Sequence, residues 1–75
     1  MKNKIDEIIN LISNREDVKE INSIIIDDIE GSVKIYYTVT DEYAKEYNLD
    51  FMNRIFEYNP NIRNLSHTRE YADMR

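Results

Sequence analysis

The stretch that decides the fold runs from residue 24 to residue 39 and reads IIIDDIEGSVKIYYTV. Its two ends, residues 24–26 and 33–39, are rich in β-branched and aromatic side chains, which favour extended strands. Glu30 and Gly31 lie between them, and glycine readily adopts the positive φ that a tight hairpin turn requires. The pattern therefore predicts an antiparallel β-hairpin.

The predicted turn also sets the pairing of the two strands. With a two-residue loop at 30–31, Ile26 lies opposite Ile35, and the next pairs are Ile25 with Tyr36 and Ile24 with Tyr37. Residues directly opposite each other share a face of the sheet. One face then carries a set of apolar core residues: Ile24, Ile26, Val33, Ile35, Tyr37 and Val39. The other face carries Ile25 and Tyr36 beside a predicted ion pair between Asp27 and Lys34.

On the N-terminal side of the hairpin, residues 3–14 predict an amphipathic helix. Its isoleucines recur at intervals of three and four residues, which places them on one helix face; they are Ile5, Ile8, Ile9 and Ile12. Asn3 is suited to cap the first turn, where Asp6 and Glu7 are also favourable.

On the C-terminal side, residues 41–58 predict a second helix, capped by Thr40 or Asp41. Its core stripe consists of Ala44, Tyr47, Phe51, Ile55 and Tyr58. Asn48-Leu49-Asp50 is a place where this helix could divide in two. Asn59-Pro60 ends it, because a residue before proline avoids the helical region.

Residues 61–67 predict a third, short strand, and residues 68–75 a flexible tail. The predicted fold class is α+β, with the order helix–strand–strand–helix–strand and both helices on one face of the sheet. A right-handed crossover through the second helix would make the third strand parallel to the second.

The composition indicates one small domain. Seventy-five residues can enclose a single hydrophobic core. The chain has no cysteine, which excludes disulfides and thiolate metal sites and is typical of reducing compartments. The first residues, MKNKIDEI, lack the apolar run of a signal peptide, and no segment is long and apolar enough to suggest a membrane span. We therefore expect a cytoplasmic protein that does not associate with membranes.

The residues that carry catalysis or bind cofactors are nearly absent. His67 is the only histidine, and in a strand its neighbours Ser66 and Thr68 would point to the opposite face. The single glycine excludes a glycine-rich phosphate loop. The segment from Asp27 to Gly31 resembles a calcium loop in composition but lacks the alternating spacing of ligands. We expect neither an enzyme nor a bound metal or cofactor.

Acidic residues form the first candidate binding site. The net charge is −5, which disfavours direct binding to nucleic acid and favours a basic protein partner. On the predicted second helix one solvent-facing stripe contains Glu42, Glu46, Asp50 and Glu57. Acids four positions apart rise about 6 Å along a helix, close to the phosphate spacing of a nucleic-acid strand. Together with the hairpin tip (Asp27, Asp28 and Glu30), this stripe is either a phosphate mimic or an ordinary solvated face.

Apolar and aromatic residues form the second candidate site. Leu49, Met52 and Phe56 make an additional apolar stripe on the predicted second helix, which either another segment or a partner covers. Ile25 and Tyr36 on the open sheet face, and Tyr43, are further candidates for contact with a protein.

Three functions are compatible with these features. The first is a small acidic inhibitor, of the kind that phages and mobile elements encode, which blocks a basic or nucleic-acid-binding protein. The second is a structural or regulatory homo-oligomer, in the simplest case a homodimer. The third is direct binding of nucleic acid through the basic end of the chain, by Arg63, Arg69, Arg75 and Tyr71.

Overall fold

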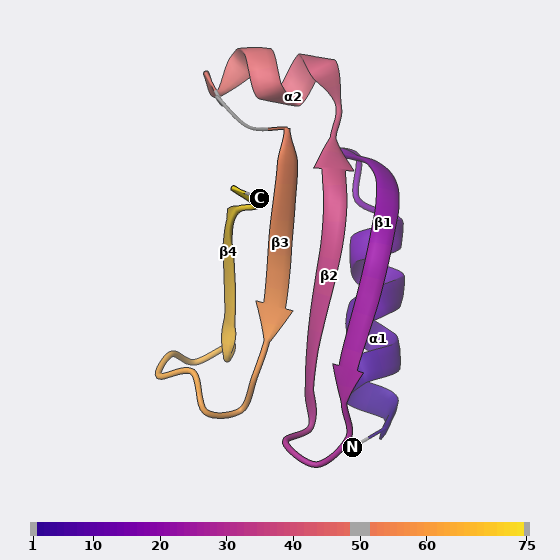
Figure 1. Ribbon diagram of the computed structural model, residues 1–75, viewed down its shortest axis with the longest axis vertical. Helices are drawn as coiled ribbons and strands as arrows, with labels where there is room; N and C mark the ends of the chain where they lie inside the picture. The colour runs from indigo at the N-terminus through magenta and orange to yellow at the C-terminus, as the bar shows by residue number, and fades with distance from the viewer. Residues whose placement is uncertain (1, 49–51, 75) are drawn as a thin grey trace.

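Four strands form one antiparallel sheet in the order β1-β2-β3-β4 (Figure 1). The computed structural model describes residues 2–48 and 52–74. The elements along the chain are α1 (Lys2–Ser13), β1 (Val18–Asp27), β2 (Ser32–Val39), α2 (Asp41–Glu46), β3 (Asn53–Tyr58) and β4 (Thr68–Ala72). The α+β class is thereby confirmed, although the sheet has four strands where the sequence predicted three.

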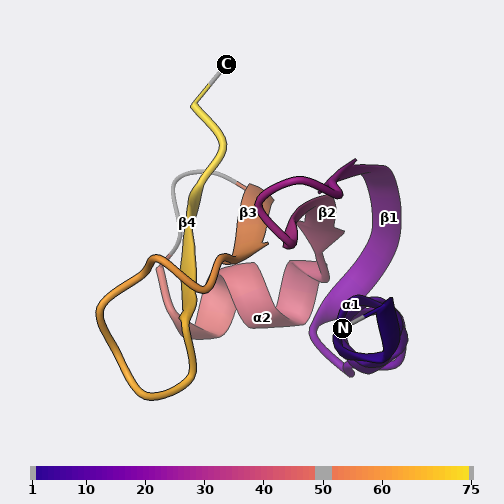
Figure 2. The ribbon, with the colours of Figure 1, turned by 90° about the horizontal axis from the view of Figure 1, so that it is seen from below.

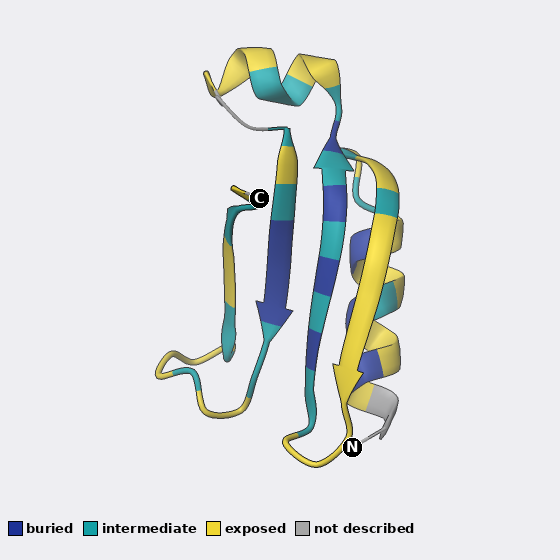
Figure 3. Cartoon of the chain, viewed as in Figure 1, coloured by how far each residue is buried: buried dark blue, intermediate teal, exposed yellow. Residues whose placement is uncertain are grey.

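The core lies between α1 and one face of the sheet, and Figure 2 shows α1 below β1. The predicted first helix is confirmed, and its residues Ile5, Ile8 and Ile12 are buried. Side chains of β2 alternate between buried and half-buried, as the bands along this strand show in Figure 3. The buried residues of β2 and β3 that contact α1 or each other are Val33, Ile35, Tyr37, Val39 and Phe56.

The hairpin is present, but its predicted loop is too short. Asp27 pairs with Ser32, so the loop contains residues 28–31. The Asp27 carboxylate accepts the N–H groups of Ile29 and Glu30 at 3.0 and 3.1 Å, which stabilises this wider turn. Gly31 adopts the predicted positive φ, 71°. The register is displaced by two residues, which keeps every side chain on its predicted face. The predicted Asp27–Lys34 pairing is wrong, because Lys34 lies opposite Ile25.

The prediction of a long second helix over residues 41–58 is wrong. Helix α2 begins at the predicted cap, where the Thr40 hydroxyl accepts the N–H of Tyr43, but it ends at Glu46. Asn48 then has a φ of 52°, a conformation that commonly follows the end of a helix. Because α2 lies across the end of the sheet (Figure 1), β3 returns antiparallel to β2 and not through a parallel crossover. Only α1 packs along the sheet face.

The C-terminal predictions are also wrong. Residues 61–67 form a loop, closed by hydrogen bonds from the N–H of Asn59 to the carbonyl oxygen of His67 and from the N–H of His67 to that of Asn64. The predicted tail contains β4, which pairs with β3 from Tyr58 opposite Thr68 to Arg54 opposite Ala72. Strand β4 therefore completes the sheet.

An ionic cluster ties the loop between α1 and β1 to β4. The Arg15 guanidinium donates to both carboxylate oxygens of Asp17, at 2.9 and 2.6 Å, and to Glu70 at 2.9 Å. The Tyr37 hydroxyl donates to the same Glu70 oxygen at 2.5 Å. These bonds link residues 55 positions apart in the chain, so the cluster fixes the tertiary arrangement.

This cluster predicts a loss of stability in acid. The hydrogen bonds from Arg15 hold the pKa of Asp17 below its ordinary value of 3.8. The contribution of Asp17 is therefore fully present above that value and is lost as the pH falls below it. We expect Asp17→Asn to lower the free energy of unfolding at pH 7 by about 1–2 kcal/mol. The difference from the wild type should shrink at about pH 3, as urea titrations at both pH values would show; an unchanged difference would contradict the assignment.

Candidate interaction surface

The outer strand β1 carries an exposed apolar row. Ile24, Ile25 and Ile26, here called the isoleucine edge, are 39%, 54% and 47% exposed. Strand β1 lies at the edge of the sheet, and most of it is exposed to solvent in Figure 3. An edge strand presents unpaired backbone N–H and C=O groups, and natural edges usually protect them with charges or prolines. In β1 the corresponding positions are three consecutive isoleucines, which do not protect the edge in this way.

The sequence pattern predicted the wrong burial for two of these isoleucines, Ile24 and Ile26. Ile24 and Ile26 lie on the same sheet face as α1, because they pair with Ile35 and Val33, and the face prediction is thus confirmed. Their predicted burial in the core is wrong, since α1 covers the residues of β2 and leaves much of both side chains open. A run of isoleucines facing both sides is typical of a strand buried on both faces. In an edge strand, the same run indicates a surface that a partner can cover.

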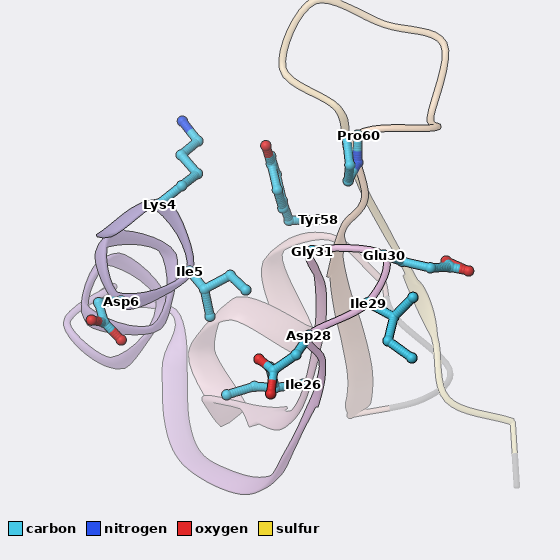
Figure 4. A pocket seen from close by; sticks show the side chains of 10 residues that line it. All are labelled: Lys4, Ile5, Asp6, Ile26, Asp28, Ile29, Glu30, Gly31, Tyr58 and Pro60. Carbon is cyan, nitrogen blue, oxygen red and sulfur yellow. The ribbon is translucent and has the colours of Figure 1, made fainter. Parts of the chain in front are cut away.

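A hollow adjoins the end of the isoleucine edge, between α1 and the hairpin tip. It encloses about 680 Å³ and is here called the tip cleft. In Figure 4, Ile5 points from α1 toward the hairpin, Lys4 and Tyr58 lie on one side, and Ile26 and Asp28 lie on the other. The Lys4 ammonium is 5.8 Å from the centre of the Tyr58 ring. The cleft thus joins an apolar floor to charged residues at its rim.

The hairpin tip does not form one acidic group. One oxygen of the Asp27 carboxylate, Oδ1, accepts the N–H groups of two residues of its own loop. Ile29 and Glu30 also line the cleft, and in Figure 4 their side chains extend away from α1; Ile29 is fully exposed. Two residues of the predicted acidic tip, Asp28 and Glu30, thus line the cleft, whereas Asp27 does not.

The second sheet face carries two rows of side chains, one aromatic and one charged. In register, Tyr36, Ile55 and Tyr71 form a row across the sheet, and Ile55 is buried although α1 lies on the other side. Burial raises the pKa of Tyr71. The predicted pairing of Ile25 with Tyr36 is wrong, since Ile25 lies opposite Lys34 and Tyr36 lies opposite Ser23, although both side chains are on this face.

The charged row places Glu57 next to Arg69. Glu57 is buried and accepts the Arg69 Nε–H at 2.7 Å, and the Tyr71 hydroxyl is 3.4 Å from the same oxygen. The bond to Glu57 raises the pKa of Arg69. Arg69 is thus engaged within the protein. Of the other arginines in the predicted nucleic-acid site, Arg63 is exposed on the loop and Arg75 lies outside the described residues.

The predicted acidic stripe is not continuous. Glu42 and Glu46 are exposed on α2, Asp50 lies outside the described residues, and Glu57 is buried on β3. The helix that would have aligned them ends at Glu46. A different group replaces the stripe: Glu16, Glu42 and Glu46 line a shallow hollow with Tyr43.

The predicted second apolar stripe mostly contributes to the core. Phe56 is buried, Met52 packs against the core, and Leu49 lies outside the described residues. Tyr43 also packs against the core, with its ring centre 4.7 Å from that of Tyr47. Met52 and Phe56 therefore do not form a free surface, whereas Tyr43 is half-buried and also lines the hollow beside α2.

No group of three or more potential metal ligands occurs among residues 2–48 and 52–74. Within the same ranges, no helix is long and apolar enough to cross a membrane.

The His67 ring contacts the carbonyl oxygen of Ile62 through Nδ1 at 3.0 Å, so it helps to hold the loop between β3 and β4. The hydroxyls of Ser66 and Thr68 bond to each other at 2.8 Å.

No protein-family model, no curated protein and no solved structure matches this chain.

Proposed function

We propose that this domain is a non-catalytic protein-binding module whose partner adds a strand to β1. The observation that carries the proposal is the isoleucine edge, three consecutive apolar residues on an edge strand. In strand addition, backbone hydrogen bonds supply affinity, and alternate side chains supply specificity. A partner strand would cover Ile24 and Ile26 on one face and Ile25 on the other.

The absence of catalysis is part of this proposal. His67 and the hydroxyls beside it make hydrogen bonds within their own loop, an arrangement that suits a structural role. The strongest ionic contacts, around Arg15 and Arg69, also join segments of the fold to each other. The chemistry of the described side chains therefore supports binding better than turnover.

An edge substitution tests the proposal. Ile25→Lys places a charge in the centre of the isoleucine edge, where a partner strand would have to bury it without a counter-ion. We expect capture of the partner from a lysate of the source organism to fall by at least about tenfold, which corresponds to about 1.4 kcal/mol of binding free energy. Quantitative mass spectrometry of the captured proteins measures this loss.

Leu65→Lys is the matched control, because Leu65 is fully exposed on the loop between β3 and β4. This variant adds the same charge to the same protein, away from the edge, and should retain the partner. If the Ile25→Lys and Leu65→Lys proteins captured the same set in equal amounts, strand addition at β1 would be refuted.

A basic partner is the second candidate, as for an inhibitor of a nucleic-acid-binding protein. It is favoured by the hollow in which Glu16, Glu42 and Glu46 lie near Tyr43, because carboxylates and an aromatic ring together suit a lysine or arginine side chain. Arg15 and Asp17 line the same hollow, but they form an ion pair with each other. The discontinuous stripe weakens the phosphate-mimicry form of this proposal. Reversing the charge of Glu42 and Glu46 should then remove a salt-sensitive partner that Ile25→Lys leaves bound.

A further inference from the structure

We propose that a second copy of this chain occupies the isoleucine edge, through antiparallel pairing of β1 with β1 of the partner around a two-fold axis at Ile25. The inference rests on the proposed function, because it uses the same edge and names the strand that is added. It goes beyond that function by fixing the register and the symmetry of the assembly.

The regular part of β1 limits where the axis can lie. The pairing of β1 with β2 is shifted between Ile21 and Ser23, and from Ser23 to Asp27 it is regular. A two-fold axis between two residues would place side chains of opposite faces against each other, which the pleat of a sheet does not allow. The axis must therefore pass through a residue.

Three positions can then be compared. An axis at Ile24 would place Ile25 opposite Ser23, and an axis at Ile26 would place Ile25 opposite Asp27. An axis at Ile25 places Ile24 of each copy opposite Ile26 of the other, and Ile25 opposite itself. This is the position that gives every residue of the isoleucine edge an apolar partner on its own face.

The same register separates the acidic ends of the two copies. Asp27 of one copy lies opposite Ser23 of the other, whose hydroxyl is a suitable donor to a carboxylate. The two Asp27 residues are then four positions apart along the seam, or about 14 Å, which exceeds the screening length of about 8 Å at physiological salt. A net charge of −5 on each copy is thus accommodated, because the hairpin tips point to opposite ends.

Single cysteines test the register directly, since the chain has no cysteine of its own. Residues opposite each other in antiparallel strands have Cα atoms about 4.5–5.5 Å apart, within the range of a disulfide. Under oxidising conditions, the Ile25→Cys protein should form a disulfide-linked dimer at least about ten times faster than the Leu65→Cys protein. An equal mixture of Ile24→Cys and Ile26→Cys should form the mixed dimer about as fast.

Ile24→Cys alone is the control for register. Its two thiols would be displaced by two residues along the seam, which puts their Cα atoms about 8 Å apart, beyond the reach of a disulfide. It should therefore be oxidised as slowly as Leu65→Cys. Sedimentation of the unmodified protein should show the average mass rising from 9.1 kDa toward twice that value with increasing concentration, and Ile25→Lys should abolish the rise.

Two results would overturn the inference. One is an unmodified protein that stays monomeric up to about 1 mM, the concentration at which even a weak contact of this kind is occupied. The other is cross-linking of Ile24→Cys alone as fast as Ile25→Cys, which would place the axis elsewhere. If the protein is monomeric and Ile25→Lys still loses a captured protein, the second copy is excluded while the proposed strand addition stands. If the protein is monomeric and Ile25→Lys captures the same proteins as Leu65→Lys, both the second copy and the strand addition at β1 are excluded.

Discussion

Tyr37→Ala is expected to leave much of the protein unfolded at room temperature, whereas Tyr37→Phe is expected to remain folded. Tyr37 is 1% exposed and is the largest of the fully buried side chains. Replacing a buried aromatic residue by alanine typically costs about 3–5 kcal/mol. At about 0.05–0.15 kcal/mol per residue, the whole free energy of unfolding of 75 residues is about 4–11 kcal/mol. Alanine at this position thus removes a large part of the total.

The phenylalanine variant separates the ring from the hydroxyl. The Tyr37 hydroxyl donates to Glu70, which also accepts from Arg15 at 2.9 Å. Burial raises the pKa of Tyr37, so the phenol remains protonated and a donor at neutral pH. Tyr37→Phe removes one hydrogen bond and leaves Glu70 paired with Arg15. Its expected cost is about 1–2 kcal/mol.

Urea unfolding followed by circular dichroism measures both variants. The midpoint should fall slightly for Tyr37→Phe and strongly for Tyr37→Ala, with little change in the slope for Tyr37→Phe. Equal costs for the two variants would show that the hydrogen bond, and not the packing of the ring, provides the stability at this position. In that case the ionic cluster around Arg15 would contribute more to the free energy of unfolding at this position than the core between α1 and the sheet.

The elements that sequence patterning predicted well are those in which local and tertiary preferences agree. In α1 the buried positions follow the helical period, from Ile5 to Ile12. In β2 they follow the strand period, from Val33 to Val39. Each pattern arises because one face of the element meets the core and the other does not. The length of the hairpin loop depended on one side-chain contact of Asp27, which the pattern of apolar residues does not record.

Strand β3 was missed because it is covered on both sides. Ile55, Phe56 and Glu57 are consecutive and all buried, so the alternation that identifies a half-buried strand is absent. Phe56 faces the core that contains the α1 isoleucines, and on the other face Ile55 lies between Tyr36 and Tyr71. Strand β4 itself was missed because Glu70 and Arg69 are typical of a polar tail. Their charges are satisfied by Arg15 and Glu57, which lie 55 and 12 positions away in the chain. Such long-range pairing cannot be read from a single sequence.

The candidate site was predicted only in part, for a related reason. Ile25 was identified as a surface residue, and it is exposed. Ile24 and Ile26 were assigned to the core, since the sequence does not indicate how far α1 extends across the sheet. The acidic stripe depended on an unbroken helix through Asn48 and failed with it. Surface sites depend on the relative placement of elements, which is the step that periodicity leaves undetermined.

Ile12→Ala and Ile25→Ala form a pair that tests whether the isoleucine edge is free for a partner. Both variants remove the same atoms, but Ile12 is 0% exposed and Ile25 is 54% exposed. We expect Ile12→Ala to cost about 2–5 kcal/mol, because it opens a cavity under the sheet. Ile25→Ala should cost at most about 1 kcal/mol, because water already reaches this side chain.

The comparison is made by urea unfolding of dilute protein, so that association through β1 does not add to the measured free energy. At high concentration the cost of Ile25→Ala should increase, because the substitution then also weakens the pairing of two copies, whereas the cost of Ile12→Ala should stay constant. If Ile25→Ala were as costly as Ile12→Ala in dilute solution, Ile25 would be part of the folded core of a single chain. A residue that the core needs in this way would not be free to bind a partner strand, and the site would have to be sought elsewhere on the surface.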